Sequence, residues 1–429
     1  MTPAARTQAT LELLESIHLA MRPADALTSA YFRARRFIGS KDRAAISTRL
    51  YAVMRHQARL DWWIEKHTLD KNPRARLLAW LALGEKLPLR AIDELCSGGK
   101  YGAAALTDAE RAFLRRIEGG TIEHSAMPDD VRAECPPESI EAFKKKFGKN
   151  FMREMRAMQE PAPLDLRVNA LKSNREEILG DLQKHGFNAK ACELSPWGIR
   201  IFERPNLNDL PMLKQGLVEI QDEGSQMVAL VLDAKPGERV VDFCAGAGGK
   251  TLAIGATMQN KGRIVACDIL EGRLKRSSER FRRAGLHNIE IKPLSSERDP
   301  WVKKHKGGFD RVLTDAPCSG TGTWRRNPDA RWHDLGPGLV KLLKIQAEIL
   351  DSAARLVKPG GVLVYATCSL LPDENENQIE AFLASHPEFT LDPCGLNGAD
   401  YLSLTPAQNG TDGFFAARMK RAATQGVTP

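Results

Sequence analysis

The sequence lacks any apolar run that could cross a membrane. Its longest strongly apolar stretch, Leu77 to Leu83, is far shorter than the roughly 20 residues that span a bilayer. The first twenty residues contain Glu12 and Glu15 and lack both the apolar segment and the small-residue cleavage site of a secretion signal. We therefore expect a soluble, cytoplasmic protein with no membrane partner.

Cysteine is scarce, with 8 in 429 residues, and no two are spaced as C-x-x-C. This usage excludes a disulfide-rich scaffold and the usual zinc motifs, so we expect reduced thiols and no bound metal. Because cysteine is more often a small buried hydrophobe than a nucleophile, most of the eight are predicted to lie in cores. Those assigned to cores are Cys96, Cys135, Cys192, Cys267 and Cys394.

Neither sign of charge is in large excess. Lys and Arg number 62 against 54 Asp and Glu, which gives a net charge of +8. The proportions of 42% hydrophobic and 27% charged residues exclude wholesale disorder. The modest basic excess suits a polyanionic partner, although charge alone does not establish nucleic-acid binding.

The chain is predicted to divide into three parts. Residues 1–135 carry apolar residues at helical spacing and almost no strand signal, which indicates an all-helical domain. Pro136 and Pro137 then precede a Lys-rich helix, which is as consistent with a solvated helix face as with RNA contact. Residues 136–225 combine this linker helix with a small α+β module, and residues 226–425 form a larger α/β domain.

The small module is predicted from short alternating runs. Residues 164–168, 199–203 and 217–221 read as strands. Ser173 and Glu176 have the spacing of a capping box for a helix that ends at Gly186.

The larger domain alternates β-rich runs with helices, which predicts a doubly wound sheet of parallel strands. The runs are residues 240–243, 264–267, 289–292, 311–314 and 362–367.

A glycine-rich turn, C-A-G-A-G-G-K-T at residues 244–251, follows the first of these strands. A P-loop would need glycine where Cys244 stands, and a dinucleotide fingerprint starting at Gly246 would need glycine where Thr251 stands. Both fits are therefore poor. A glycine turn with Asp268 closing the next strand instead suits a nucleoside whose ribose hydroxyls bond the acid, and S-adenosylmethionine fits this arrangement.

Two cysteines, Cys318 and Cys368, follow neighbouring strands at the carboxyl edge of the predicted sheet. Methylation of carbon 5 of a pyrimidine needs a thiolate that adds to carbon 6 and makes carbon 5 nucleophilic. Asp315, just before Cys318, is placed to bond the Watson–Crick edge of the base and stabilise its protonated form. Cys318 stands where enzymes that methylate an exocyclic amine have an aromatic residue, which argues against that reaction.

Six ordered stretches resemble the Nop/Sun family of RNA 5-methylcytosine methyltransferases, and within it the branch that acts on bacterial 16S ribosomal RNA. They are L-R-V-N-A-L-K at 166–172, Q-D-E-G-S at 221–225, D-F-C-A-G-A-G-G-K-T at 242–251, D-A-P-C-S-G-T-G at 315–322, N-P-D-A-R-W at 327–332 and Y-A-T-C-S at 365–369. The resemblance implies a Rossmann-like class I methyltransferase domain. K-D-R-A at 41–44 and Y-A-V-M-R at 51–55 resemble, less specifically, an antitermination-factor type of RNA-binding bundle.

The resemblance also implies residue roles. It makes Cys368 the nucleophile and Cys318 the residue that assists product release, with Asp315 on the target base. The residues that it assigns to the cofactor are Cys244, Ala245, Gly246, Ala247, Gly248, Gly249, Lys250, Asp268, Arg273 and Asp315.

Two positions depart from the family pattern. Ser295 stands where the family has an acid that bonds the adenine amino group, and Ala247 stands where it commonly has proline. Basic residues follow Asp268 along a helix, and except at Arg273 we interpret them as solvated surface. The loop Trp324, Arg325, Arg326 is interpreted as an RNA contact, because basic residues beside an aromatic suit a splayed-out base.

We expect an enzyme that methylates carbon 5 of a cytidine in RNA through a covalent cysteine adduct, with 16S ribosomal RNA as the expected substrate. The same chemistry on transfer RNA is an alternative. A non-catalytic RNA-binding factor for ribosome assembly is a second alternative, favoured slightly by the missing acid at Ser295.

Overall fold

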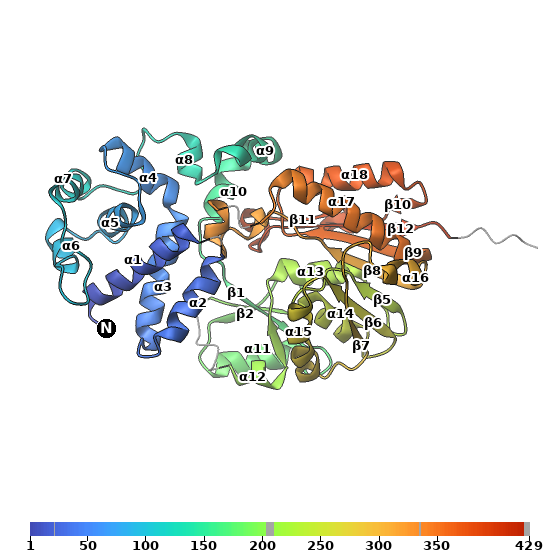
Figure 1. Cartoon of the computed structure of the whole chain (residues 1–429). Helices are drawn as coiled ribbons and strands as arrows, with labels where there is room; N and C mark the ends of the chain where they lie inside the picture. The colour runs from blue at the N-terminus through green and yellow to red at the C-terminus, as the bar shows by residue number, and fades with distance from the viewer. Residues whose placement is uncertain (21, 203–209, 334–335, 424–429) are drawn as a thin grey trace, which may run out of the picture. The chain divides into compact units, whose positions relative to one another are not determined.

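The computed structural model describes residues 1–20, 22–202, 210–333 and 336–423 and divides the chain into two compact units (Figure 1). A helical unit comprises Met1–Glu160 together with Trp324–Gly336. An α/β unit comprises Pro161–Thr323 and Pro337–Pro429. The three-part division at residues 135 and 225 stays a prediction, since the structure groups the linker helix with the helical unit.

The helical unit has the all-helical character that the sequence predicts, with no strand in its described residues. Thr2 caps the first helix by accepting a hydrogen bond from the Ala5 backbone N–H, and Thr107 with Glu110 forms a capping box. Apolar faces pack into one core that includes Ile46 and Leu60. The helices are α1 (Pro3–Leu19), α2 (Ala24–Ala34), α3 (Ser40–Arg55), α4 (Gln57–Lys66), α5 (Pro73–Leu83), α6 (Leu89–Leu95), α7 (Asp108–Ile117), α8 (Asp129–Ala133), α9 (Pro137–Phe147) and α10 (Phe151–Ala157).

The segment Trp324–Gly336 packs within the helical unit, although it follows the Cys318 loop in the sequence. Asp329 accepts a hydrogen bond from the Ala24 backbone N–H at 2.8 Å, and Arg55 donates to the Arg325 carbonyl oxygen at 2.9 Å. Trp324 is 2% exposed and Arg325 is 5% exposed. The interpretation of these two residues as an RNA contact is therefore wrong, because their side chains are buried in protein. A contact from Arg326 stays a prediction.

The small module of the α/β unit is an antiparallel sheet in the order β2-β3-β1-β4. The predicted capping box is wrong: Asn174 caps α11 by accepting from the Glu177 backbone N–H, while Ser173 bonds the Glu177 side chain. Glu203, at the end of one predicted strand, lies outside the described residues. The elements are β1 (Leu164–Val168), α11 (Arg175–Lys184), β2 (Ala189–Ala191), β3 (Gly198–Ile201), α12 (Pro211–Gln215) and β4 (Val218–Ile220).

The large sheet has the order β10-β12-β9-β8-β5-β6-β7, with β11 paired to β12. The run from β9 to β7 is parallel, which confirms the predicted α/β class. The antiparallel strands β10, β11 and β12 were not predicted, and they make the sheet mixed. The strands are β5 (Arg239–Asp242), β6 (Arg263–Asp268), β7 (Ile289–Pro293), β8 (Phe309–Asp315), β9 (Val357–Thr367), β10 (Phe389–Leu391), β11 (Leu402–Leu404) and β12 (Phe414–Arg421).

Both faces of the large sheet are buried under helices. Val241 packs with Ile349 in one core, whereas its neighbour Val240 packs with Ile254 in another, as expected when successive side chains point to opposite faces. The helices are α13 (Glu223–Leu232), α14 (Gly249–Thr257), α15 (Glu271–Ala284), α16 (Pro300–Lys304), α17 (Leu339–Leu356), α18 (Glu376–Ser385) and α19 (Pro406–Asn409). Within the described ranges, no helix combines the length and apolarity needed to cross a membrane.

Candidate active site

The glycine-rich turn connects β5 to α14. Gly246 and Gly248 have φ angles of +54° and +78°, which favour glycine. At Gly248 a Cβ atom would also come within 2.6 Å of the Phe281 ring. The Gly246 backbone N–H donates to Asp268 at 2.8 Å, so the acid that closes β6 also holds the turn.

A cavity of about 390 Å³ lies over this turn, within the usual size range of small-molecule sites. Asp268, Arg273 and Asp315 line it together with the turn residues, whereas Gly248 does not. Sequence reasoning missed further lining residues, including Gln221, Ser225, Asp242, Ile269, Leu270, Leu294, Glu297, Ile345 and Ile349. Ile269 and Leu270 directly follow Asp268, whereas Leu294, Ile345 and Ile349 come from distant segments that no local motif marks.

The burial and hydrogen bonds of Asp242 indicate whether this cavity suits S-adenosylmethionine. Its side chain is fully buried, Oδ2 accepts a hydrogen bond from Thr251 at 2.7 Å, and Oδ1 has no partner among the described residues. Burial raises the pKa of this carboxyl from 3.8 to about 7. An unpartnered buried acceptor beside a cavity suits a cationic or N–H donor, such as the ammonium group of S-adenosylmethionine.

Lys250 and Asp315 form an ion pair at the same cavity, with Nζ 2.6 Å from Oδ2. Burial acts to lower the Lys250 pKa, but the charge and hydrogen bond of Asp315 outweigh it, so the pKa is raised and the lysine stays protonated. One oxygen of the Asp315 carboxylate is therefore paired with the protonated Lys250 side chain. Sequence reasoning did not anticipate this ion pair.

The two predicted cysteines lie side by side. Parallel pairing places Asp315 of β8 opposite Ala366 of β9, so both chains leave the sheet at the same edge. The Sγ atoms of Cys318 and Cys368 are 3.4 Å apart, within hydrogen-bond distance. The hydrogen bond to Cys368, burial and nearby Glu374 raise the Cys318 pKa, so Cys318 keeps its proton.

The other cysteines are free thiols as well. Cys244 lines the cavity, and burial beside Asp242 and Asp268 raises its pKa well above the ordinary value, which makes it a poor nucleophile. Cys96, Cys135, Cys192 and Cys267 are buried as predicted, and Cys394 is partly buried.

Glu297 is the acid nearest in the sequence to Ser295, the position that departs from the family pattern. Ser295 is turned toward Asp299, to which its backbone N–H and hydroxyl both donate, at 2.8 and 2.9 Å. Glu297 lines the cavity instead. A carboxylate two residues further along the chain is therefore available at the cavity.

Part of the basic run on α15 is not solvated surface, which corrects that interpretation. Arg280 and Arg283 form ion pairs with Glu219, which is 5% exposed, at 2.8 and 2.7 Å. Arg280 also donates to the Ala247 carbonyl oxygen at 2.5 Å. Arg280 therefore braces the glycine-rich turn, whereas Arg283 pairs with Glu219 from an exposed position.

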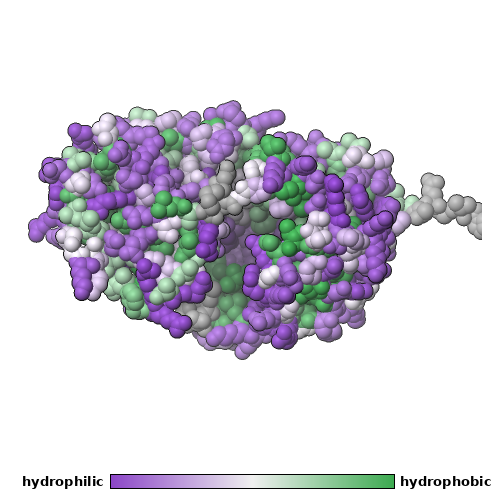
Figure 2. Space-filling view, viewed as in Figure 1, coloured by the Kyte–Doolittle hydropathy of each residue, from purple (hydrophilic) through white to green (hydrophobic). Residues whose placement is uncertain are grey.

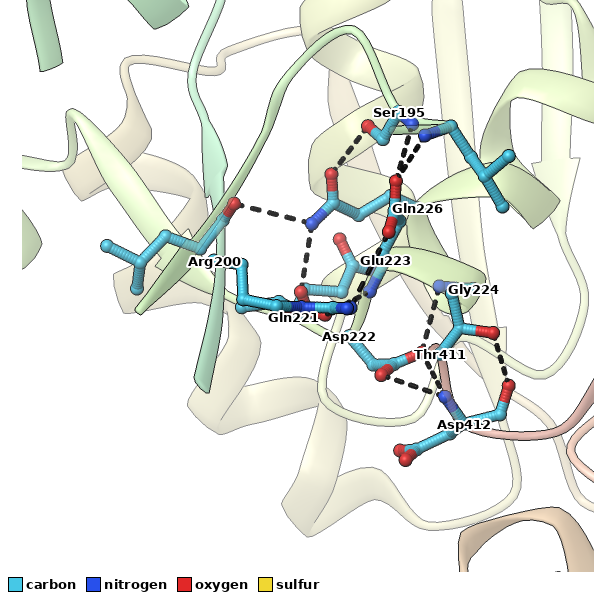
Figure 3. Close-up of polar contacts among 12 residues, drawn as sticks. Ser195, Arg200, Gln221, Asp222, Glu223, Gly224, Gln226, Thr411 and Asp412 are labelled. Atoms are coloured by element: carbon cyan, nitrogen blue, oxygen red, sulfur yellow. Dashed lines mark hydrogen bonds and ion pairs between the residues drawn. The ribbon is translucent and has the colours of Figure 1, made fainter. Parts of the chain in front are cut away.

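The Q-D-E-G-S stretch joins the small sheet to the large one (Figure 3). Glu223 accepts from the Ser195 backbone N–H at 2.9 Å and pairs with Arg200 at 3.5 Å. Asp222 accepts from the backbone N–H groups of Gly224 and Asp412, the latter in the loop before β12. This motif therefore holds three parts of the α/β unit together through hydrogen bonds and an ion pair.

The L-R-V-N stretch reaches the glycine-rich turn from the small sheet. Arg167 is 3% exposed and donates to the Gly249 carbonyl oxygen at 2.6 Å and to the Gln221 side chain. Gln221 in turn donates to Ser225 at 3.0 Å, and both line the cavity. Arg167 thus holds one wall of the cavity in place.

Comparisons with known proteins agree with this geometry. The family model of the 16S rRNA methyltransferase RsmB/F matches residues 229–420, and a model of the ferredoxin-like domain of RsmF/B-like methyltransferases matches residues 139–208. A probable ribosomal RNA small subunit methyltransferase B from Synechocystis is 32% identical over 412 residues, 89% of this chain and 92% of that protein. Ribosomal RNA small subunit methyltransferase B from Yersinia pseudotuberculosis is 31% identical over 394 residues, 89% of this chain and 91% of that protein.

A solved structure of a methyltransferase homolog from Pyrococcus horikoshii has a TM-score of 0.59 and 30% identity, covering 68% of this chain and 97% of that one. The whole-length relatives, the family models and the cavity at the glycine-rich turn point to one conclusion. The chain belongs to the 16S rRNA methyltransferase RsmB/F family and is an S-adenosylmethionine-dependent methyltransferase.

Proposed function

We propose that this enzyme methylates carbon 5 of a cytidine in the RNA of the small ribosomal subunit. The observation that carries the proposal is the pair of thiols, Cys318 and Cys368, 3.4 Å apart. Methylation of an exocyclic amine or a ribose hydroxyl needs no thiol, whereas carbon 5 becomes nucleophilic only after a thiolate adds to carbon 6.

Cys368 is the proposed nucleophile, and Cys318 is its protonated partner. The Cys368 thiolate would add to carbon 6, and the displaced electron pair would let carbon 5 take the methyl group of the sulfonium, which leaves as a neutral thioether. Solvent would then accept the proton of carbon 5, and the electron pair of that bond would restore the double bond between carbons 5 and 6 as the bond from carbon 6 to Cys368 breaks. Cys318 keeps its proton and lies within hydrogen-bond distance of the Cys368 sulfur, so as a thiol it is placed to stabilise that sulfur as it departs. Asp315 is proposed to bond the cytosine edge, with Lys250 fixing the carboxylate.

S-adenosylmethionine supplies the electrophilic methyl group when bound. Asp268 is proposed to accept from its ribose hydroxyls, Glu297 from its adenine amino group and Asp242 from its ammonium group, since all three line the cavity. The remaining predicted cofactor residues, Cys244 to Lys250 with Arg273, are proposed to contribute backbone donors and cavity walls, except for Gly248, which shapes the turn.

RNA from the small ribosomal subunit is the proposed substrate because the whole-length relatives bear that name. In the helical unit we propose a contact at the α2–α3 surface, defined as Arg33, Arg36, Phe37 and Lys41. Phe37 is 77% exposed in the turn between the two helices, and the three cations beside it in the sequence are exposed. On the face shown in Figure 2 this unit is mostly hydrophilic with small hydrophobic spots.

Transfer RNA stays the alternative substrate. The non-catalytic alternative is not supported, because the chain belongs to a family of methyltransferases and the cavity and thiol pair are both present.

The experiment compares ribosomal and transfer RNA from a strain lacking the protein with RNA from its parent. Bisulfite sequencing detects 5-methylcytosine because that base resists deamination. We expect one cytosine of the small-subunit RNA to lose its protection, and purified enzyme with labelled cofactor to restore it. Loss confined to transfer RNA would establish the alternative substrate, and a methyl group found on an exocyclic amine would overturn the proposal.

A further inference from the structure

Glu374 is a buried carboxylate that the proposed chemistry does not yet use. It ends the short helix η5 (Pro372–Glu374) and is fully buried. Its Oε1 accepts hydrogen bonds from the Ser319 backbone N–H at 2.8 Å and from Gln346 at 2.9 Å. Its Oε2 accepts from the Ser319 hydroxyl at 2.5 Å. These donors are all neutral, so the hydrogen-bond network stabilises the carboxylate without cancelling its charge.

The hydrogen-bond network of Glu374 is connected more closely to the Cys318 loop than to the Cys368 turn. Ser319, which directly follows Cys318, makes two hydrogen bonds to the carboxylate, and Gln346 also holds the Pro317 carbonyl oxygen at 2.9 Å. Ser369, which follows Cys368, contacts the Ser319 hydroxyl at 3.2 Å and has no bond to Glu374. Among the described residues, the carboxylate itself therefore bonds the Cys318 loop directly and reaches the Cys368 turn through Ser319.

We propose that Glu374 is a positioning residue that holds Cys318 against Cys368 and keeps Cys318 in its thiol form. The proposal rests on the proposed function, in which one thiol adds to the base and the other keeps a proton. A buried negative charge opposes a second one nearby, and Glu374 is one of the causes that raise the Cys318 pKa. The carboxylate thus distinguishes two thiols that otherwise lie at equivalent strand ends.

The first test measures thiol reactivity without RNA, so it does not depend on the proposed function. The Cys318-containing peptide is followed by mass spectrometry during alkylation with iodoacetamide between pH 6 and 10, in a Cys368→Ala background. Glu374→Gln keeps the shape but removes the charge, so alkylation of Cys318 should begin at lower pH than in the parent. Glu380→Gln, on the exposed face of α18, should leave the profile unchanged.

The second test measures methyl transfer in the chain with both cysteines. Glu374→Gln should slow single-turnover methylation about 10-fold or more, the effect expected for hydrogen bonds to a charged group. Glu374→Asp keeps the charge but is one methylene shorter, so it should slow methylation while leaving the alkylation profile near that of the parent. Ser319→Ala removes one hydrogen bond to the carboxylate but not its charge, so it should likewise slow methylation and leave the alkylation profile near that of the parent. This variant replaces the Glu374 variants if they do not fold.

An alkylation profile unchanged by Glu374→Gln in a folded protein would overturn the proposal, as would full activity of that variant. If the parent enzyme proves not to methylate carbon 5, the alkylation shift still decides whether Glu374 controls Cys318. Failure of the inference and failure of the proposed function are therefore separate outcomes.

Discussion

The sulfur atoms of Cys318 and Cys368 lie 3.4 Å apart although 50 residues separate them in the chain. Parallel pairing of β8 and β9 brings them together, because both residues follow the carboxyl ends of neighbouring strands. Their environments differ: Cys318 is held in its thiol form, and protonated Lys250 lies close enough to interact electrostatically with Cys368. A positive charge near one thiol and a retained proton on the other suit a nucleophile and its acid partner.

Substitution of each cysteine separates these roles. Cys368→Ala should abolish methylation and any covalent enzyme–RNA complex, because the nucleophile is gone. Cys318→Ala should accumulate a covalent adduct, visible as a nuclease-sensitive slow band on a denaturing gel, and the double variant should show none. If Cys368→Ala traps RNA instead, the roles are reversed, and if neither single variant loses activity the covalent mechanism must be abandoned.

Asp242 should make the cofactor-free enzyme less stable as pH rises. Its pKa is near 3.8 when unfolded and about 7 when folded, so between these values the unfolded chain loses a proton that the folded chain keeps. The free energy of unfolding should fall across that window by up to about 4 kcal/mol, and no further above pH 7.

Asp242→Asn should remove this contribution. Urea unfolding at pH 5 and pH 8 should show the variant gaining stability relative to the parent at the higher pH, with weaker cofactor binding. Asp400→Asn, at an exposed position, is the matched control. An equal pH dependence in parent and Asp242→Asn would contradict the assignment.

Asp268→Ala should weaken S-adenosylmethionine binding by roughly 10- to 150-fold, as expected on loss of hydrogen bonds to a charged group. The ribose loses an acceptor, and the turn loses the carboxylate that holds the backbone N–H groups of Gly246 and Leu270. Calorimetry measures the dissociation constant, and circular dichroism checks folding. An unchanged constant in a folded variant would remove Asp268 from the site.

Glu297→Gln should weaken S-adenosylmethionine binding, because it removes the carboxylate available to the adenine amino group. Introducing the acid usual in the family, through Ser295→Asp, should not tighten binding: the new carboxylate would face Asp299, with which Ser295 now bonds. Calorimetry on both variants distinguishes the two positions. Tighter binding by Ser295→Asp with no effect of Glu297→Gln would return the role to residue 295.

The α2–α3 surface should account for part of the salt dependence of RNA binding. Substituting Arg33, Arg36 and Lys41 by serine should flatten the log–log slope by up to about 2, since each phosphate contact on a single strand contributes about 0.7. Phe37→Ala should weaken binding by ~1–3 kcal/mol without changing the slope, as loss of one stacked base would.

Arg90→Ser, at an exposed cation on α6, is the control, and filter binding at several salt concentrations is the measurement. Point substitutions are preferable to removing residues 1–135, because that deletion would expose buried Trp324 and its neighbours. Unchanged slope and affinity would show that this surface serves another partner.

The sequence alone determined the α/β class, the glycine-rich turn and the placement of Cys318 and Cys368 after successive strands. These features follow from local patterns: apolar runs of strand length, glycines where φ is positive, and residues directly after a strand. The resemblance to a family assigned roles that spacing could not supply, and those roles stay predictions.

The tertiary structure decided what depends on residues that are far apart in the chain. Trp324 and Arg325 look like an RNA-binding loop in sequence but are buried within the helical unit, because burial is set by neighbours and not by composition. Asp242 has an unpartnered oxygen, Glu297 reaches the cavity where Ser295 does not, and Glu374 holds the Cys318 loop. Each of these features depends on how strand ends and loops come together in space, which no local pattern encodes.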